Sequence, residues 1–528
     1  MEKRQPPDSY PTGLIGMELK DLLETVDVEE TQGPLDKPVD GLSYDSRKVK
    51  RGYVFFAVRG LCSDGHDFVA QAVERGASAV VVEHRVAVSQ DVACVRVRNV
   101  RRAMGKWAAS FFDHPSRRMV LVGVTGTNGK TTSTYLLESI FMAAGLSCGV
   151  IGTINYRYQN RFFPAPNTTP ESVDLQAFLA EMAQAGVQSL GMEVSSHALE
   201  MERVRGIEFD GALFTNLSRD HLDFHGDMEH YFLTKARLFL DYLLESPKAR
   251  KFAVIHGVGP WGEQLLKKVR QSNLEVVSYG LGREWDVHIR EFESDLDGVR
   301  GKIQVRDQAF DFSTRLIGEA NLENILGAVG VGVALGMPTS QISEGIARLD
   351  SVPGRLERIR NGLGITVLVD YAHTPDALER VLHALRPLTR GRLIALFGCG
   401  GDRDRGKRIL MGEIAARLTD LVVLTSDNPR TEEPVRIIEE IEEGVRKTGK
   451  KKFQISNFKS QNGGGEKGYY VEPDRRASIR LALRLARAGD LLLVAGKGHE
   501  DTQIVGSRRI HFDDREVVQE ELELSASS

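Results

Sequence analysis

The chain has 528 residues, of which 41% are hydrophobic and 27% are charged, so it is long enough for about three domains and too long for a single small module. Its 69 basic and 73 acidic residues leave a net charge of −4, and we therefore expect neither nucleic acid nor an anionic membrane surface as a partner. The four cysteines have no Cys-x-x-Cys spacing, and no apolar run reaches about 18 residues, which predicts a cytoplasmic protein without disulfides, a zinc site or a membrane span.

The first part of the chain alternates short apolar runs with helical patterns. The runs at 54–58 and 79–82 have the length of buried strands, and residues 68–75 have the spacing of a helix. This pattern predicts a small α/β domain over residues 1–115.

A new pattern begins at residue 118, with a buried-type strand at 119–124, a turn, and a helix at 133–144. The turn reads Gly126-Thr-Asn-Gly-Lys-Thr-Thr132, and backbone N–H groups between a strand and a helix can bind phosphates. Lys130 would contact the β- and γ-phosphates, and Thr131 would bind Mg²⁺. The turn departs from the common phosphate loop because Val124 stands where the first glycine is expected.

Polar clusters follow two later apolar strands, at 192–197 and 214–221. Loops at the carboxyl ends of parallel strands converge on one crevice, which would bring Glu193 and His221 toward the phosphate loop. Mg²⁺ takes few carboxylates together with waters and phosphate oxygens, so one glutamate, one histidine and the loop threonine suit it. Taken singly, His221 and His225 are more typical of loop histidines with local hydrogen bonds than of metal ligands, and only the whole set of residues favours the metal site. The sequence predicts a central P-loop ATPase-type domain with a parallel sheet over residues 116–350.

Further apolar strands at 365–369, 393–397, 421–424 and 491–495 alternate with helical patterns. This alternation predicts another parallel sheet in a Rossmann-like domain over residues 351–528. Residues 450–468 are rich in Lys, Asn and Gly and are predicted to form a surface insertion.

Ten ordered motifs resemble the Mur ligase family over nearly the whole chain. They are Tyr44-Asp-Ser-Arg47, Gly126-Thr-Asn-Gly-Lys-Thr-Thr132, Asn167-Thr-Thr-Pro170, Met192-Glu-Val-Ser-Ser-His197, Asp220-His-Leu-Asp-Phe-His-Gly226, Pro353-Gly-Arg-Leu-Glu357, Asp370-Tyr-Ala-His-Thr-Pro375, Gly400-Gly-Asp-Arg403, Asp427-Asn-Pro-Arg430 and Ala495-Gly-Lys-Gly-His-Glu500. Ten motifs in order are far more specific than one phosphate loop.

The resemblance implies a three-domain α/β enzyme, with a UDP-binding domain, an ATPase domain and a domain that supplies an amino acid. It implies that ATP phosphorylates the D-glutamyl carboxylate of UDP-N-acetylmuramoyl-L-alanyl-D-glutamate, and that the amine of meso-2,6-diaminopimelate attacks the acyl phosphate. Phosphoryl transfer between two anions needs cationic screening. The implied cofactors are ATP, Mg²⁺ and a carbamate formed from CO₂ on Lys235, and we expect a monomer.

The resemblance also implies a role for individual residues. The implied catalytic residues are Lys130, Glu193, His221, Lys235 and Arg355, and the implied Mg²⁺ ligands are Thr131, Glu193, His221 and Lys235. The nucleotide would be bound by Gly126, Thr127, Asn128, Gly129, Lys130, Thr131, Thr132, Asn324, Arg355 and Asp370. The UDP-linked peptide would contact Tyr44, Ser46, Asn167, Thr168, Thr169, Ser195 and Arg203. The incoming amino acid would contact Arg403, Asp427, Asn428, Pro429, Arg430, Gly496 and Glu500.

Four alternatives stay open at this stage. The same chemistry could add L-lysine, although only diaminopimelate offers Arg430 a carboxylate at its far stereocentre. A folylpolyglutamate synthase shares the ATPase logic but lacks the motifs at 167–170 and 427–430. A non-catalytic scaffold or a regulatory P-loop NTPase would not depend on an amino acid. Departures from the family pattern are His256-Gly-Val-Gly259, Met201 and Leu61-Cys62-Ser63, and the first of these puts a contact on the adenine side in doubt.

Overall fold

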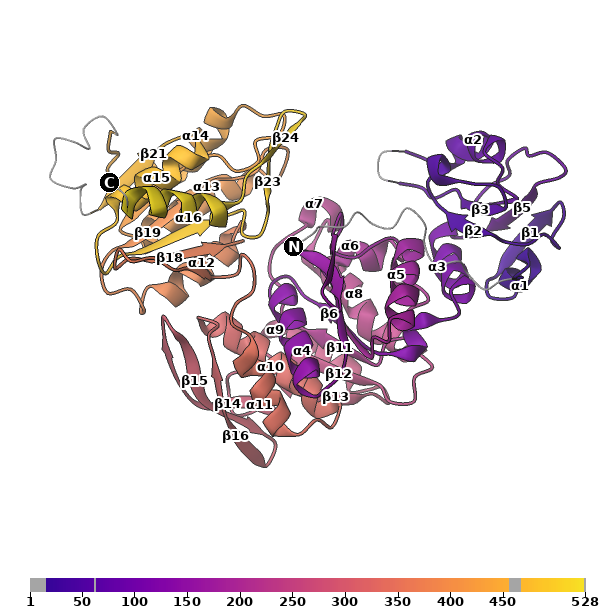
Figure 1. Ribbon diagram of the computed structural model, residues 1–528, viewed down its shortest axis with the longest axis horizontal. Helices are drawn as coiled ribbons and strands as arrows, with labels where there is room; N and C mark the ends of the chain where they lie inside the picture. Colours follow the sequence, from indigo (N-terminus) through magenta and orange to yellow (C-terminus); the bar gives the residue numbers. More distant parts are fainter. Residues whose placement is uncertain (1–15, 61–62, 455–466, 527–528) are drawn as a thin grey trace.

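The computed structural model describes residues 16–60, 63–454 and 467–526. Three large sheets form three bodies along the chain (Figure 1), with the N-terminal body in indigo and the C-terminal body in orange and yellow. A further sheet of two strands follows the last strand of the C-terminal sheet in the sequence. Cys62 and most of the insertion predicted at 450–468 lie outside the described residues. The three-part α/β architecture predicted from the sequence is confirmed.

The N-terminal body is a five-stranded sheet of order β1-β5-β4-β3-β2. Only β1 runs antiparallel to its neighbour. Trp107 in α3 is fully buried under this sheet, and the same helix packs on α5 of the central body. The elements are α1 (Leu19–Leu23), β1 (Val28–Gln32), β2 (Gly41–Ser43), β3 (Tyr53–Phe56), α2 (Val69–Glu74), β4 (Ala79–Val82), β5 (Ala93–Val97) and α3 (Val100–Phe111).

The central body contains an eleven-stranded sheet of order β16-β15-β14-β13-β12-β11-β6-β10-β7-β8-β9. Its elements begin with β6 (Val120–Thr125), α4 (Lys130–Ala143), β7 (Cys148–Ile151), β8 (Asn155–Tyr158), β9 (Arg161–Pro164), α5 (Ser172–Gln184), β10 (Ser189–Glu193), α6 (Ser196–Glu200), β11 (Gly211–Phe214), α7 (Leu222–His225) and α8 (Met228–Arg237). A π-helical turn (Leu238–Leu243) follows α8, and the body continues with β12 (Phe252–His256), α9 (Gly259–Val269), β13 (Glu275–Tyr279), β14 (Val287–Asp295), β15 (Gly298–Val305), β16 (Gln308–Thr314), α10 (Glu319–Ala334) and α11 (Thr339–Arg348).

The central sheet is mixed, whereas the sequence predicts a parallel one. The strands from β13 to β7 are parallel and carry an apolar cluster on each face, as expected for strands covered by helices on both sides. Antiparallel ribbons extend the sheet at both edges, through β8 and β9 and through β14, β15 and β16. These outer strands are joined as antiparallel ribbons and need no crossover helix, so the strand–helix alternation of the sequence did not predict them.

The C-terminal body has a six-stranded sheet of order β17-β18-β22-β19-β20-β21, parallel except for β17. The four strands predicted in this part of the chain are present within one residue of their expected limits. The elements are β17 (Glu357–Ile359), β18 (Thr366–Asp370), α12 (Pro375–Leu385), β19 (Leu393–Phe397), α13 (Gly406–Leu418), β20 (Leu421–Leu424), α14 (Pro434–Lys447), β21 (Gly468–Val471), α15 (Arg475–Leu485), β22 (Leu491–Ala495), β23 (Thr502–Val505), β24 (Arg508–His511) and α16 (Asp514–Ala526).

Within the described residues, none of the helices is both long enough and apolar enough to cross a bilayer.

Candidate active site

The phosphate loop joins β6 to α4. Gly126 and Gly129 have φ angles of +147° and +85°, and a Cβ atom at Gly126 would overlap the Thr215 hydroxyl. The helix begins at Lys130, three residues before the predicted start, because left-handed Gly129 lets the chain turn directly into it. The first N–H groups of α4 have no acceptor within the helix, and its N-terminus favours an anion.

Two lysine ammonium groups meet at this loop. Lys130 Nζ donates to the carbonyls of Gly126 and Thr127, both at 2.9 Å, and Lys235 Nζ donates to the same Gly126 carbonyl at 2.9 Å. Lys235 is 1% exposed and lies 4.6 Å from the centre of the Tyr231 ring. Burial, together with the positive charge of Lys130, holds the pKa of Lys235 well below its usual range. This shift favours the neutral amine, which is the form that reacts with CO₂.

Glu193 ends β10 beside the loop and is 1% exposed. Its carboxylate accepts hydrogen bonds from the backbone N–H and the hydroxyl of Thr153, both at 2.9 Å. Burial lowers the pKa of Lys130, and the charges of Glu193 and Asp220 oppose that shift. These charges place Glu193 and Asp220 in the electrostatic environment of the loop lysine.

His221 has a left-handed backbone, with φ of +54°, and is the N-cap residue of α7. Its ring packs edge-on against His197 with the centroids 5.0 Å apart. Burial lowers the pKa of His221 to about 4, so its imidazole is neutral and able to bind a metal near pH 7. His225, in contrast, lies within hydrogen-bonding distance of the Ser196 hydroxyl at 2.9 Å, which is the local structural role considered for it.

The donor set fits Mg²⁺ better than a metal that needs a closed protein cage. Within the described parts of the chain, no three His, Cys, Asp or Glu side chains are grouped closely enough to hold a metal ion. One carboxylate, one imidazole and a threonine hydroxyl leave room for waters and phosphate oxygens, which Mg²⁺ retains. A carbamate on Lys235 would add a second anionic oxygen ligand.

Arg355 connects the C-terminal body to the loop. It lies between α11 and β17, donates to the Thr131 hydroxyl at 3.3 Å, and stacks over the Tyr371 ring with its guanidinium 4.6 Å from the centroid. A second connection runs from Asn128 Nδ2 to the carboxylate of Asp376, at 3.1 Å. Arg355 therefore reaches the first turn of α4, next to the phosphate loop.

The remaining residues predicted for the nucleotide lie around this point. Asn324 in α10 is buried, and a Cβ atom at Gly129 would overlap its side-chain oxygen. Asp370, at the end of β18, accepts from the N–H groups of Leu356 at 2.7 Å and Ala372 at 2.8 Å, and burial raises its pKa. His256 lies at the end of β12 with Nε2 3.4 Å from the Glu323 carboxylate. Thr127 and Thr132 are in the loop and in the first turn of α4.

The residues predicted for the UDP-linked peptide form two groups. In the N-terminal body, Tyr44 donates to Asp174 of α5 at 2.5 Å, and Ser46 donates to Gln71 at 2.6 Å. The second group lies near the end of β10 and consists of Asn167, Thr168, Thr169, Ser195 and Arg203. Within it, the Thr169 hydroxyl donates to the Glu193 carbonyl at 2.8 Å, and Arg203 donates to the Thr169 carbonyl at 3.2 Å. This second group therefore adjoins the predicted metal ligand Glu193.

Two arginines lie at the carboxyl edge of the C-terminal sheet. Arg430 has a left-handed backbone with φ of +53°, and its guanidinium donates to the Gly401 carbonyl at 2.7 Å. Arg403 is exposed and donates to the Asp402 carbonyl at 3.1 Å. No carboxylate of the described residues pairs with either arginine at 4 Å or less, and the Arg430 side chain points to Gly401 instead of capping α14. The guanidinium groups of both arginines can donate hydrogen bonds to a carboxylate of a ligand.

Carboxylates lie beside these arginines. Asp427 is 6% exposed, and a Cβ atom at Gly496 would come within 2.7 Å of its carboxylate. Glu500 accepts from the Asn428 amide at 2.9 Å and lies 3.4 Å from the Lys497 ammonium. Pro429, which stands between Asn428 and Arg430 in the sequence, is buried. Positive and negative side chains next to each other suit a ligand that carries both charges.

Three further residues lie at this site, and the sequence alone indicated no role for them. Thr153 holds both oxygens of Glu193, Asp376 reaches the phosphate loop, and His373 lies on the loop between Asp370 and Asp376. His373 and Asp376 follow the carboxyl end of the strand predicted at 365–369, and that position was the available signal. Thr153 follows β7, where the sequence predicted no strand.

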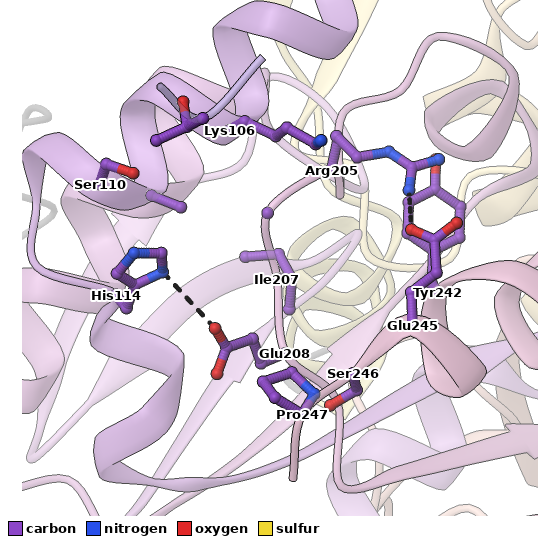
Figure 2. A pocket seen from close by; sticks show the side chains of 13 residues that line it. Lys106, Ser110, His114, Arg205, Ile207, Glu208, Tyr242, Glu245, Ser246 and Pro247 are labelled. Carbon is purple, nitrogen blue, oxygen red and sulfur yellow. Dashed lines mark hydrogen bonds and ion pairs between the residues drawn. The ribbon is translucent and has the colours of Figure 1, made fainter. Parts of the chain in front are cut away.

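A separate cavity of about 260 Å³ lies away from the phosphate loop, near the amino ends of β6 and β11. Figure 2 shows the Lys106 side chain extending toward Arg205, and His114 directed at Glu208. Strand polarity separates this cavity from the loop, which follows the carboxyl end of β6.

Three family models match consecutive parts of the chain. They are the Mur ligase family catalytic domain over residues 38–112, the Mur ligase middle domain over 124–332, and the Mur ligase glutamate ligase domain over 354–498.

Curated proteins match over nearly their full length. The chain is 48% identical to UDP-N-acetylmuramoyl-L-alanyl-D-glutamate–2,6-diaminopimelate ligase of Geobacter metallireducens over 503 residues, which cover 95% of this chain and 98% of that one. It is 47% identical to the protein of the same name from Geobacter sulfurreducens, with 95% and 97% covered. A solved structure of a ligase with that name matches with a TM-score of 0.68 at 31% identity, and covers 97% of this chain and 100% of that one.

Proposed function

Because the chain belongs to the Mur ligase family, we propose that it is the ATP-dependent ligase that adds meso-2,6-diaminopimelate to UDP-N-acetylmuramoyl-L-alanyl-D-glutamate. The reaction is a step in the synthesis of peptidoglycan precursors, and through them of the cell wall. The names of the relatives at 48% and 47% identity support this substrate pair. The structural observation that carries the proposal is the contact of Arg355 with Thr131, which brings the C-terminal body to the phosphate loop.

The reaction needs an activated carboxylate, because a carboxylate does not react with an amine near neutral pH. The γ-phosphate of ATP is transferred to the D-glutamyl carboxylate to form an acyl phosphate, and the amine then displaces phosphate. Lys130 and Arg355 approach the loop from two bodies, so both can balance the negative charge that moves during transfer. The N–H groups at the start of α4 hold the other phosphates.

Thr131, Glu193, His221 and a carbamate on Lys235 would hold Mg²⁺ at the loop. Mg²⁺ bound there supplies cationic screening between the phosphoryl donor and the acceptor carboxylate. The low pKa of Lys235 supports the carbamate, since only the neutral amine adds to CO₂. The carbamate changes the charge of the side chain from positive to negative and so removes repulsion toward the metal.

The charged edge of the C-terminal sheet suits diaminopimelate. Arg430 and Arg403 would bind the carboxylate at the far stereocentre, and Asp427 and Glu500 would bind the distal ammonium near the Gly496 backbone. L-Lysine has an ammonium but no carboxylate at that position, so it would leave Arg430 unpaired. Tyr44 and Ser46 would hold the uridine end of the other substrate.

We further propose a cytoplasmic monomer that divides into domains at residues 1–115, 116–350 and 351–528. The three sheets support these limits, because their strands span 28–97, 120–314 and 357–495.

Phosphate release measures the proposed reaction directly. The purified protein is incubated with ATP, Mg²⁺ and the UDP-muramoyl dipeptide, and then with meso-diaminopimelate, L-lysine or no amino acid. Release that depends on diaminopimelate is the expected result. Dependence on L-lysine would give the alternative substrate, and release that needs no amino acid would identify an NTPase instead of a ligase.

A further inference from the structure

His373 lies on the loop that leaves β18 and enters α12. Asp370 precedes this loop, and Asp376 in the first turn of α12 contacts Asn128 of the phosphate loop at 3.1 Å. Lys407 of α13 donates to the His373 carbonyl at 2.9 Å, and α13 follows the segment that contains Arg403. The backbone of His373 is therefore tied to the ATP side of the site on one flank and to the amino-acid side on the other.

The hydrogen bond of the ring fixes which nitrogen carries the proton. His373 Nδ1 lies 2.9 Å from the carbonyl oxygen of Tyr371, and a carbonyl can only accept, so Nδ1 donates. In the neutral ring, Nε2 then has a free lone pair. Within the part of the chain that the structure describes, Nε2 has no hydrogen-bond partner, and the residue is only half-buried. Nε2 can therefore accept a proton from a ligand.

The burial of the ring and the cations that face it favour its neutral form. Burial lowers the pKa of His373, and so do Lys407 of α13 and Arg355, whereas Asp220, on the loop before α7, acts in the opposite direction. The Tyr371 ring packs against the imidazole with centroids 4.5 Å apart. Tyr371 also supports Arg355, so one aromatic side chain positions both the histidine and the arginine directed at the phosphates.

We propose that His373 Nε2 is the general base that takes a proton from the attacking ammonium group of the amino-acid substrate; this inference rests on the proposed ligase function. The freed lone pair forms the new C–N bond at the acyl carbon, and the C–O bond to phosphate breaks with its electron pair going to phosphate. The second proton of the nitrogen leaves with phosphate as HPO₄²⁻. The imidazolium then returns its proton to water, so the reaction releases one proton overall.

The test separates proton removal from acyl-phosphate formation. Hydroxylamine is largely unprotonated at neutral pH and attacks acyl phosphates without a base, so it reports the first half of the reaction as a hydroxamate. His373→Asn keeps a donor for the Tyr371 carbonyl but has no basic nitrogen, and His373→Gln is the second variant. We expect both variants to form hydroxamate near the wild-type rate while their amide formation with diaminopimelate falls by about 10²–10⁴-fold.

The pH dependence of amide formation distinguishes a general base from a residue with a purely structural role, because only the loss of a base should depend on pH in this way. The deficit in amide formation should shrink as pH rises, because more of the substrate amine is then unprotonated without enzymatic help. His383→Gln, on an exposed position of the same helix α12, is the matched control and should behave like wild type.

Three results would overturn the inference. Normal amide formation by both variants would exclude a base at His373, and an equal fall of amide and hydroxamate would place His373 in ATP binding or phosphoryl transfer. A wild type that forms neither product from the UDP-muramoyl dipeptide would refute the proposed function, and the role of His373 with it.

Discussion

Two ammonium groups donate to the single carbonyl oxygen of Gly126, and this crowding determines how the lysines differ. Lys130 can leave the loop carbonyls for a phosphate, which offers a full negative charge. Lys235 is enclosed, and the positive charge of Lys130 works with burial to lower its pKa. Carbamylation relieves the repulsion because it replaces one of two like charges with an opposite one.

A chemical-rescue experiment tests the carbamate. Lys235→Ala should lose about 10²–10³-fold in kcat, the usual effect of removing a preorganised electrostatic group, and should regain part of it with added short-chain carboxylic acids. Lys267→Ala, on an exposed position of α9, is the control. It should keep the wild-type kcat, and added carboxylic acids should not change that kcat. A crystal structure with metal bound and a bare Lys235 ammonium would contradict the assignment.

The loop lysine acts on the transferred phosphate itself. Lys130→Ala should lower kcat by at least about 10²–10³-fold, because the charge that develops in transfer loses its closest fixed cation. Circular dichroism should show a folded protein, since α4 and its apolar face are unchanged. A folded variant with near-normal amide formation would show that the phosphates bind elsewhere.

Arg430 controls the choice of amino acid in the proposed site. Wild type should prefer meso-diaminopimelate over L-lysine by roughly tens to thousands-fold in kcat/KM, because lysine leaves a desolvated arginine unpaired at a cost of about 2–5 kcal/mol. Arg430→Ala should reduce that preference, and Arg436→Ala, exposed on α14, should not. Equal use of both amino acids by wild type would refute the assignment.

At the scale of elements, local sequence predicted the parts that depend on local order. Strands β19, β20 and β22 and the phosphate loop are continuous patterns, and the structure places them where the sequence does. The links from Thr153 to Glu193 and from Asn128 to Asp376 join residues 40 and 248 positions apart. Such pairings depend on the order of the strands in the sheet and on the contact between the central and C-terminal bodies. A local sequence pattern carries no information about either.

The C-terminal helix α16 supports the amino-acid side through a buried ion pair. Arg475 forms two hydrogen bonds with Asp514, at 2.6 and 2.7 Å, and both side chains are fully buried. The same guanidinium donates to the carbonyls of Ser426 and Ala495, which precede Asp427 and Gly496. Removing one partner of a buried pair leaves an uncompensated charge.

Asp514→Ala should therefore lower the free energy of unfolding by about 3–5 kcal/mol, measured by urea denaturation followed with circular dichroism. Glu520→Ala removes the exposed pair with Arg476 on the same two helices and should cost less than about 1 kcal/mol. If the two variants lost a similar free energy of unfolding, burial of the Arg475–Asp514 pair would not increase the contribution of that pair to stability.

At the scale of the whole molecule, the site is assembled from separate bodies. The loop and the predicted metal ligands belong to the central body, whereas Arg355, His373 and Asp376 come from beyond residue 350. Few polar contacts join the two at the loop, so their relative position depends on individual hydrogen bonds. A single hydrogen bond contributes about 0.5–1.5 kcal/mol, which is small for stability and large enough to change ligand binding.

The contact between Asn128 and Asp376 is the most direct test of this coupling. Asp376→Ala should raise the KM for ATP by about 2–10-fold, the equivalent of one lost hydrogen bond, because the C-terminal body is less often held against the loop. Arg380→Ala breaks the pair of Asp376 with Arg380 within α12 and leaves the Asn128 contact in place, so it should not change this KM. In the double variant with Asn128→Ala, the second substitution should add little, because both remove the same interaction. Fully additive effects would show that the two residues act on ATP independently and that this contact does not hold the two bodies together.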